Sequence, residues 1–180
     1  VAAHMRATTG RVRPVGSGHS FTGLAPSEGM MVDASALEGM FAYDAATGEA
    51  TFVAVTRLFH VASALDEVGR ALPNLPDIDV QTLAGSFATG THGTGNTLSA
   101  LHDYITAFQL VTANGEVMDV TETSHPELFG AGKVSLGALG IMTQFTIRTV
   151  PQFNLHRQMV AEEIDPFFEK IEDLAKAHRN

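Results

Sequence analysis

One stretch of the chain, residues 57–69, carries apolar side chains at the spacing of an α-helix. The apolar positions recur every three or four residues and are Leu58, Val61, Leu65, Val68 and Leu72. Thr56 precedes them, and its hydroxyl is placed to cap the first turn. The pattern predicts an amphipathic helix over this stretch, with one face packed against a core.

Four shorter segments also have the sequence features of helices. They are residues 1–10, residues 81–88, a helix opened by the capping box of Ser124 and Glu127 with Pro126 in its first turn, and a terminal helix with Phe167, Ile171 and Leu174 on one face. The first of these ends at Gly10 but has no start signal before it. We therefore expect the chain to begin inside a longer protein.

The remaining apolar segments have the length and alternation of β-strands. The predicted strands are residues 11–15, 30–33, 41–44, 50–55, 104–112, 116–120, 141–151 and 152–160. Thr47-Gly48 and Asn114-Gly115 separate neighbouring strands as hairpin turns do. The order of elements predicts an α+β fold, with mixed strands first and antiparallel strands after the second hairpin.

Composition narrows the possible functions. The 180 residues are 44% hydrophobic and contain no cysteine, which predicts a globular core and excludes disulfides and thiolate chemistry. The formal charge of −9, without a basic cluster, argues against nucleic acid as a partner. Long apolar runs and a signal peptide are absent, so we expect a soluble, cytoplasmic protein with no membrane segment. The histidines lack the spacing of metal ligands, so no metal site is predicted.

The segment PVGSGHSFTG, at residues 14–23, is the first candidate for chemistry. Gly16 and Gly18 free the backbone to take positive φ, and successive N–H groups in such a turn form a concavity that binds anions. The alternative is an ordinary tight turn. The segment does not open a helix, so it lacks the context of a Rossmann dinucleotide loop, and the chain has no P-loop motif.

Two later segments add to it. LAGSFATGTHGTGN, at residues 83–96, surrounds His92 with glycines and threonines whose hydroxyls can converge on a flat polar ligand. SLGALGIM, at residues 135–142, lets the backbone pass close to another group before the next strand. Each segment alone is equally consistent with a surface loop or a turn at the start of a strand.

Taken together and in this order, the three segments resemble the FAD-binding domain of the vanillyl-alcohol-oxidase superfamily, and most closely that of sugar-lactone and alditol oxidases. The resemblance implies a two-lobed PCMH-type domain, with a small mixed-sheet lobe and a larger lobe of antiparallel sheet and helices, here truncated. It implies a first FAD-binding subdomain at residues 1–56, a second at residues 57–150, and the start of a substrate-domain connection at residues 151–180. FAD is expected in the crevice between the two subdomains.

The resemblance also assigns residues to the cofactor. The pyrophosphate would be held mainly by backbone N–H groups of the first segment, whose assigned residues are Pro14, Val15, Gly16, Ser17, Gly18 and Ser20. The flavin ring and ribityl chain would lie near Thr82, Gly85, Ser86, Gly90, Thr91, His92 and Thr94, and the adenine side near Ile141. In relatives with histidine at the position of His19, that side chain is joined covalently to the flavin, whereas relatives with leucine hold FAD non-covalently.

The activity implied is oxidation of a CH–OH group of a sugar lactone or polyol, with O2 as acceptor. The catalytic side chains of this family lie in the substrate domain and are expected beyond residue 180. Two alternatives remain open: a cofactor-binding module with no activity of its own, and a non-covalent FAD dehydrogenase or reductase of the same fold.

Overall fold

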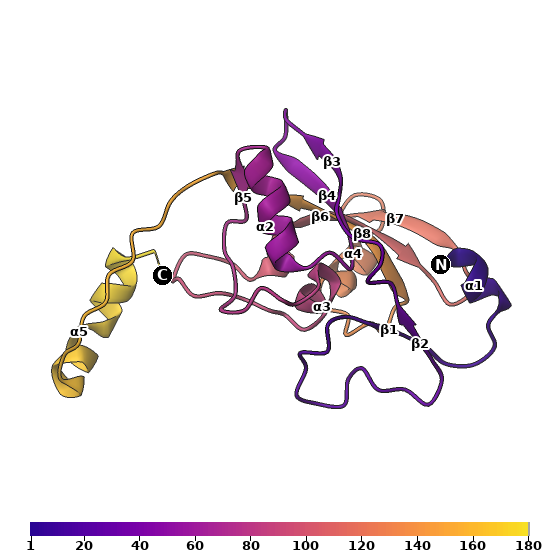
Figure 1. Ribbon diagram of the computed structural model, residues 1–180, viewed down its shortest axis with the longest axis horizontal. Helices are drawn as coiled ribbons and strands as arrows, with labels where there is room; N and C mark the ends of the chain where they lie inside the picture. The colour runs from indigo at the N-terminus through magenta and orange to yellow at the C-terminus, as the bar shows by residue number, and fades with distance from the viewer. Residues whose placement is uncertain (180) are drawn as a thin grey trace.

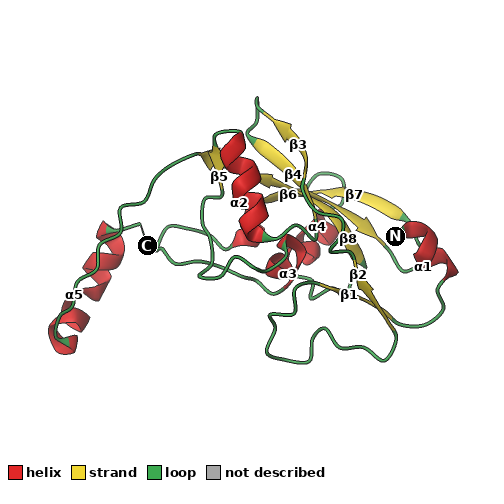
Figure 2. Cartoon of the chain, in the orientation of Figure 1, coloured by secondary structure: helices red, strands yellow, loops and turns green. Residues whose placement is uncertain are grey.

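The computed structural model describes residues 1–179, and its centre is a five-stranded antiparallel sheet (Figures 1 and 2). The order across the sheet is β3-β4-β8-β6-β7, where β3 is Met40–Asp44, β4 is Glu49–Val53, β8 is Ile141–Arg148, β6 is Ile105–Val111 and β7 is Val117–Thr121. Both predicted hairpins, β3–β4 and β6–β7, are present. The strand of this sheet that comes last in the sequence, β8, therefore lies in the middle of the sheet between the two hairpins.

The core lies between this sheet and three helices. Phe145 of β8 pairs with Phe52 of β4 on one side and with Phe108 of β6 on the other, which sets a row of aromatic side chains across the sheet. The Phe87 ring contacts Phe145 edge-on, with a centroid distance of 4.9 Å. The helices whose apolar faces join this core are α2 (Leu58–Glu67), α3 (Leu83–Ala88) and α4 (Pro126–Lys133). The predicted periodicity of α2 is confirmed, because Leu58, Val61 and Leu65 are fully buried.

The N-terminal elements form a smaller unit beside the sheet. Strands β1 (Val12–Val15) and β2 (Met30–Asp33) are paired in parallel, as a separate two-stranded sheet. Helix α1 (Ala2–Ala7) buries Met5 against Val111 and Ile141, at the end of the large sheet. These contacts hold the long loop between β1 and β2 next to the ends of β4 and β8 (Figure 1).

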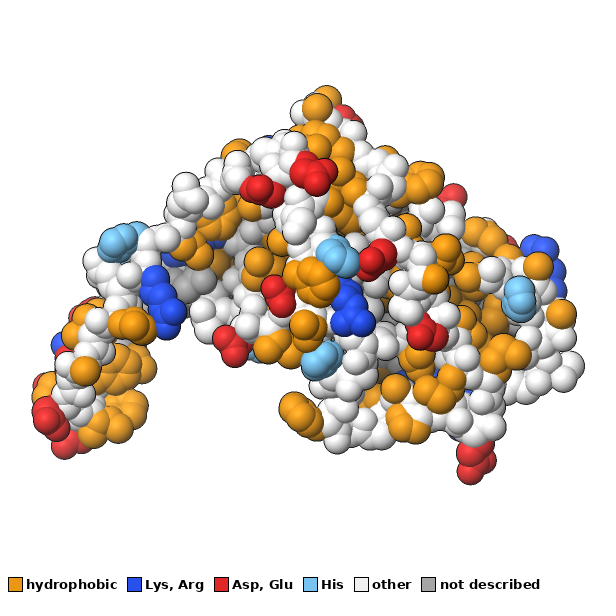
Figure 3. Space-filling model, viewed as in Figure 1, with side chains coloured by type: hydrophobic (Ala, Val, Ile, Leu, Met, Phe, Trp, Pro, Cys, Tyr) orange, Lys and Arg blue, Asp and Glu red, His pale blue; other side chains and the backbone are white. Residues whose placement is uncertain are grey.

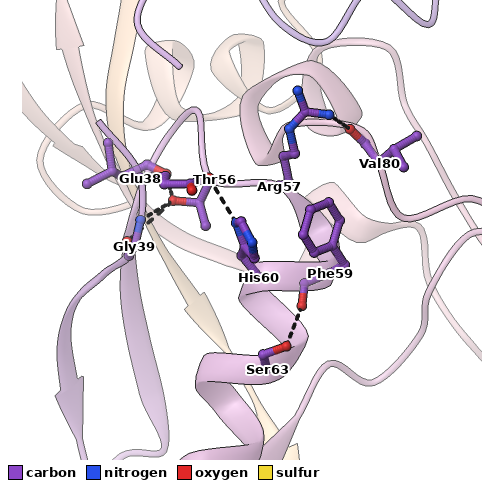
Figure 4. Close-up of polar contacts among 9 residues, drawn as sticks. Glu38, Gly39, Thr56, Arg57, Phe59, His60, Ser63 and Val80 are labelled. Carbon is purple, nitrogen blue, oxygen red and sulfur yellow. Dashed lines mark hydrogen bonds and ion pairs between the residues drawn. The ribbon is translucent and has the colours of Figure 1, made fainter. Parts of the chain in front are cut away.

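Thr56 does not cap α2, contrary to the prediction. Its side chain is fully buried, where its hydroxyl donates to Val53 O at 2.7 Å and accepts from the Gly39 N–H at 2.9 Å (Figure 4). Arg57 occupies the N-cap position without a capping hydrogen bond. The hydroxyl is drawn into a long-range contact between the start of β3 and the end of β4, so it is not free to cap. His60 Nδ1 lies 2.9 Å from Glu38 Oε2, which joins α2 to the segment before β3 (Figure 4).

The capping box predicted before α4 is also absent. His125 is the N-cap residue, and it makes no side-chain capping bond. The Ser124 hydroxyl instead accepts from the Thr121 N–H at 2.9 Å, within the turn that follows β7. The helix still begins at Pro126, as the sequence predicts.

The C-terminal region differs from the prediction in its strand and agrees in its helix. Strand β9 (Val150–Pro151) pairs with β5 (Arg70–Ala71), but residues 152–160 form no strand and are exposed throughout. No neighbouring strand within residues 1–179 pairs with that segment. Helix α5 (Ile164–Ala177) then stands apart from the sheet, with apolar side chains open to solvent (Figures 1 and 3).

Strand pairing bears on the expected division of the chain at Thr56. Strands β3 and β4, which we assigned to the first subdomain, are hydrogen-bonded into the sheet of the second through β8. The sheet boundary therefore lies between β2 and β3. The division into two FAD-binding subdomains and a connection stays a prediction in its other respects.

Candidate functional site

A cavity of about 420 Å³ lies where the loop after β1, the start of α3 and the segment before β8 meet. Its volume falls within the range of about 300–1,000 Å³ that is usual for small-molecule sites. The three glycine-rich segments, which are far apart in the sequence, all contribute to its wall. The lining residues from these segments include residues 14–20, Thr82, Gly85, residues 135–137, Gly140 and Ile141.

The three segments contact one another directly. A Cβ atom built on Gly16 would lie 2.6 Å from the hydroxyl oxygen of Thr82, which directly precedes the second segment, so a side chain at residue 16 would force one of the two to move. A Cβ atom on Gly137 would lie 3.5 Å from Pro14 Cγ, which is an ordinary contact between the third segment and the first. The Leu136 N–H donates to Ala88 O at 3.2 Å and joins the third segment to the second. The wall of the cavity is thus one continuous packed surface.

The N-terminus of α3 has no N–H group left for a ligand in its first turn. The Leu83 N–H donates to Thr56 O and the Ala84 N–H donates to Ala54 O, both at 2.8 Å. The Gly85 N–H donates to the Thr82 hydroxyl at 3.1 Å, which makes Thr82 the N-cap residue. These three N–H groups of α3 are therefore all hydrogen-bonded within the protein, and an anion in the cavity needs other donors.

The loop after β1 supplies such donors. Within residues 1–179, none of the N–H groups of residues 17–20 donates a hydrogen bond. These residues line the cavity, and Gly18 has a φ of 75°, in the left-handed region that favours glycine. A run of unpaired N–H groups around a left-handed residue is the geometry of an anion-binding nest.

Charged side chains of both signs lie at or beside this end of the cavity, because Arg13 lines it and Asp33 lies between the lining residues Val32 and Ala34. The Arg13 guanidinium donates to Leu24 O, in the loop that lies over the cavity. Asp33, at the end of β2, accepts from the Ser35 N–H at 2.8 Å, and that hydrogen bond lowers the pKa of its carboxyl below the usual value. The carboxylate is thus already bound to a backbone donor of its own loop.

Ten of the residues assigned from the resemblance line the cavity. They are Pro14, Val15, Gly16, Ser17, Gly18, His19, Ser20, Thr82, Gly85 and Ile141. Ser86 is fully buried instead, and its hydroxyl donates to Leu83 O at 2.8 Å. Its position inside α3 turns the side chain towards the core rather than the cavity.

The other four assigned residues, Gly90, Thr91, His92 and Thr94, do not contribute to the cavity wall. The backbone here is pressed against a different segment, because a Cβ atom on Gly93 would lie 2.3 Å from Asn74 Oδ1. The Asn74 side chain also donates to Thr94 O at 3.2 Å. His92 is exposed, and its Nδ1 lies 2.8 Å from Gly93 O. Their contact with a cofactor stays a prediction.

Arg13 and Gln81 are among the residues of the cavity wall that sequence reasoning missed. Both come directly before residues that we assigned, Pro14 and Thr82. A polar or charged side chain next to a glycine-rich segment was the available signal. This signal does not show which way a side chain points. The direction depends on where the strand ends and where the helix begins, and the sequence predicts those boundaries only to within a residue or two.

Two further findings concern metal ligands and membrane-spanning helices. Within residues 1–179, no group of three or more histidine or acidic side chains is arranged to hold a metal ion. The same part of the chain has no helix that is both long and apolar enough to cross a membrane.

Comparison with known proteins identifies the family. Residues 1–121 match the family described as FAD binding domain, and the chain belongs to that family. It is 39% identical over 163 residues to L-gulono-1,4-lactone dehydrogenase of Mycobacterium tuberculosis, covering 91% of this chain and 37% of that protein. It is 35% identical over 155 residues to L-gulonolactone oxidase of Bos taurus, covering 86% of this chain and 35% of that protein.

A solved structure gives the same result for the fold. The carbohydrate oxidase from Microdochium nivale superposes with a TM-score of 0.69 at 25% sequence identity, covering 78% of this chain and 30% of that one. The α+β FAD-domain fold and the likeness to sugar-lactone oxidases, both predicted from the three glycine-rich segments, are confirmed. The chain spans about a third of the length of these relatives.

Proposed function

We propose that this chain binds FAD in the cavity between its three glycine-rich segments, as part of an oxidoreductase that oxidises a CH–OH group of a sugar lactone or polyol. The observation that carries the proposal is the run of unpaired N–H groups at residues 17–20, which line the cavity of a chain from an FAD-binding family. A pyrophosphate supplies several oxygen acceptors for such groups. The close approach of Gly16 to the Thr82 hydroxyl holds this loop against the start of α3, on the same cavity wall.

Each segment has its own part in holding the cofactor. The N–H groups of residues 17–20 bind the pyrophosphate, and the Arg13 guanidinium adds a positive charge beside it. Thr82 and Gly85 present the flavin side of the wall, and Ile141 the adenine side. All of these assignments except that of Arg13 follow the resemblance, and all of the residues named line the cavity.

His19 forms the covalent link to the flavin in this proposal. Its side chain is exposed in the wall of the cavity and makes no hydrogen bond to another residue within 1–179. A neutral imidazole with a free ring nitrogen is a competent nucleophile. The bond would join a ring nitrogen to the 8α-methyl carbon of the flavin, as in relatives that have histidine at this position. It would replace one C–H bond of the methyl group and the imidazole N–H, and the two hydrogens would leave the flavin reduced by two electrons until O2 reoxidised it and was itself reduced to H2O2.

The reaction divides between the cofactor and the protein. Bound FAD supplies the hydride-accepting chemistry, and this chain binds and orients it. In this proposal, the side chains that bind the sugar and move its proton lie in the substrate domain of the whole protein, beyond residue 180. We therefore expect the isolated chain to bind the cofactor without turning over substrate.

A dehydrogenase is the second candidate, because the Mycobacterium tuberculosis relative is named as one while the bovine relative is named as an oxidase. The two differ in what reoxidises the flavin. Oxygen consumption by the whole protein with an aldonolactone would indicate an oxidase. Turnover only with an added electron acceptor would indicate a dehydrogenase.

The test of the proposed function uses the purified whole protein that contains this chain. Visible absorption should show bound flavin, and anaerobic addition of an aldonolactone or an alditol should bleach the band as the flavin is reduced. A protein that folds but carries no flavin, and takes up none from added FAD, would contradict the proposal. Bound flavin that no lactone or polyol bleaches would contradict only the substrate class.

A further inference from the structure

Gln81 holds a buried polar atom that nothing in the described protein satisfies. It immediately precedes Thr82, the N-cap residue of α3, and lines the cavity. Its side-chain oxygen, Oε1, is buried and has no hydrogen-bond partner within residues 1–179. A buried carbonyl without a partner costs about 1–3 kcal/mol. Such a group needs an explanation, and a ligand that brings a donor is one.

The other end of the same side chain is already engaged. Gln81 Nε2 donates to the Thr91 hydroxyl at 3.3 Å, and that hydroxyl lies 3.4 Å from the Thr89 hydroxyl. Thr89 in turn donates to Gly85 O at 3.0 Å, inside α3. This orientation of the amide pairs the nitrogen with the Thr91 hydroxyl and leaves the oxygen as the atom that can accept from a donor.

We infer that Gln81 is a further cofactor-contacting residue, whose Oε1 accepts a hydrogen bond from an N–H or O–H group on the flavin or ribityl part of FAD. The inference rests on the proposed function. Thr82 and Gly85, the neighbours of Gln81 in the wall, are the residues assigned to that part of the cofactor. The ring N–H and the ribityl hydroxyls are donors of the required kind.

The same geometry gives Thr91 a role as a positioning residue. It does not line the cavity, but it accepts the hydrogen bond that fixes the Gln81 amide. Thr91 would then act on the cofactor through Gln81. This explains how a residue assigned to the flavin by resemblance can lie behind the wall of the cavity.

The experiment compares Gln81→Leu with Thr91→Val in the whole protein, in a His19→Leu background where FAD binds reversibly. Two quantities are measured for each: the melting temperature without FAD, and the FAD dissociation constant from flavin fluorescence. Leucine keeps much of the volume of Gln81 but removes the unpaired carbonyl. We expect the FAD-free melting temperature to stay unchanged or rise, while FAD affinity falls about tenfold.

Thr91→Val is the matched control for the hydrogen bond behind the wall. It should weaken FAD binding less than Gln81→Leu, and the double variant should bind no more weakly than Gln81→Leu alone, because Thr91 acts through Gln81. In the wild-type His19 background, Gln81→Leu should also shift the visible absorption bands of the bound flavin.

The outcomes separate this inference from the proposed function. If the parent protein binds FAD and Gln81→Leu binds it equally well with an unshifted spectrum, Gln81 is not a cofactor contact. A fall in the FAD-free melting temperature with unchanged FAD affinity would show a purely structural side chain. If neither the parent nor the wild-type protein binds FAD, the proposed function itself fails, and the inference fails with it.

Discussion

Gly16 and Thr82 meet so closely that a Cβ atom on residue 16 would lie 2.6 Å from the Thr82 hydroxyl oxygen. The same oxygen accepts the Gly85 N–H at 3.1 Å and caps α3. The loop that offers free N–H groups is therefore fixed against the start of the helix at a point with no spare room. This contact joins the first glycine-rich segment to the second.

A methyl group at residue 16 should disrupt that contact. Gly16→Ala should lower FAD affinity about tenfold or more, because the loop must move away from α3 and carry the N–H groups of residues 17–20 with it. Thr82→Ala removes the oxygen and its cap, at a cost of about 1 kcal/mol in stability. In the Thr82→Ala background Gly16→Ala should have a smaller effect, as measured by FAD titration and thermal unfolding. Fully additive effects would show that the contact does not place the loop.

Gly18 tests the conformation of the loop rather than its packing. Its φ is 75°, and an added Cβ would meet no protein atom within 4 Å. Alanine costs about 1–2 kcal/mol in this region, and a turn to negative φ would redirect the neighbouring N–H groups. Gly18→Ala should therefore lose FAD affinity while its secondary structure, followed by circular dichroism, is kept.

Gly69→Ala is the control for Gly18→Ala. Gly69 also has positive φ, at 68°, and open space around it, but it lies at the end of α2 and not in the cavity wall. It should lower the melting temperature by a similar amount and leave the FAD dissociation constant unchanged. Equal losses of FAD affinity in both variants would make the Gly18 effect one of general stability.

Two glycines in α4 provide a test of the core. A Cβ atom on Gly132 would lie 2.2 Å from Phe108 Cζ, whereas one on Gly130 would meet nothing within 4 Å. Gly132→Ala should destabilise the protein by about 1–3 kcal/mol through overpacking. Gly130→Ala should stabilise it by about 0.5–1 kcal/mol through helix propensity. Denaturant unfolding of both variants measures the difference, and the opposite order would place α4 differently on the sheet.

Local sequence patterns were enough to predict most elements of the fold. The periodicity of α2 and the turns at Gly48 and Gly115 are short-range signals, and each formed the element expected. The two helix caps failed because capping competes with other hydrogen bonds. Thr56 is taken up by Gly39, which is 17 residues away in the sequence, and no local pattern carries that information.

The candidate site was predictable in its segments but not in all its side chains. The three glycine-rich segments converge because β8 runs between the two hairpins and brings Ile141 towards the loop after β1. Composition alone predicts neither the pairing nor the convergence, and the family resemblance predicted the convergence but not the strand order. Whether Gln81 or Thr91 reaches the cavity depends on where α3 begins, which only the structure determines.

The covalent link at His19 has a direct test. Denatured wild-type protein should fluoresce in a gel as a flavin–peptide adduct, because a covalent bond survives conditions that break every hydrogen bond. His19→Leu should lose the fluorescence and still bind FAD reversibly, since the N–H groups of residues 17–20 do not depend on the side chain. Wild-type protein with every site occupied by FAD that releases all of its flavin on denaturation would rule out the covalent bond to His19.

The central claim is that the N–H groups of residues 17–20 bind the pyrophosphate of FAD. Amide hydrogen exchange, resolved by residue and compared with and without FAD, measures this most directly. These amides have no acceptor within residues 1–179, so they should exchange rapidly in the FAD-free protein and become protected when FAD is added. Amides of the β3–β4 turn, distant from the cavity wall, serve as the internal reference and should not change. FAD binding that leaves residues 17–20 unprotected would contradict the account.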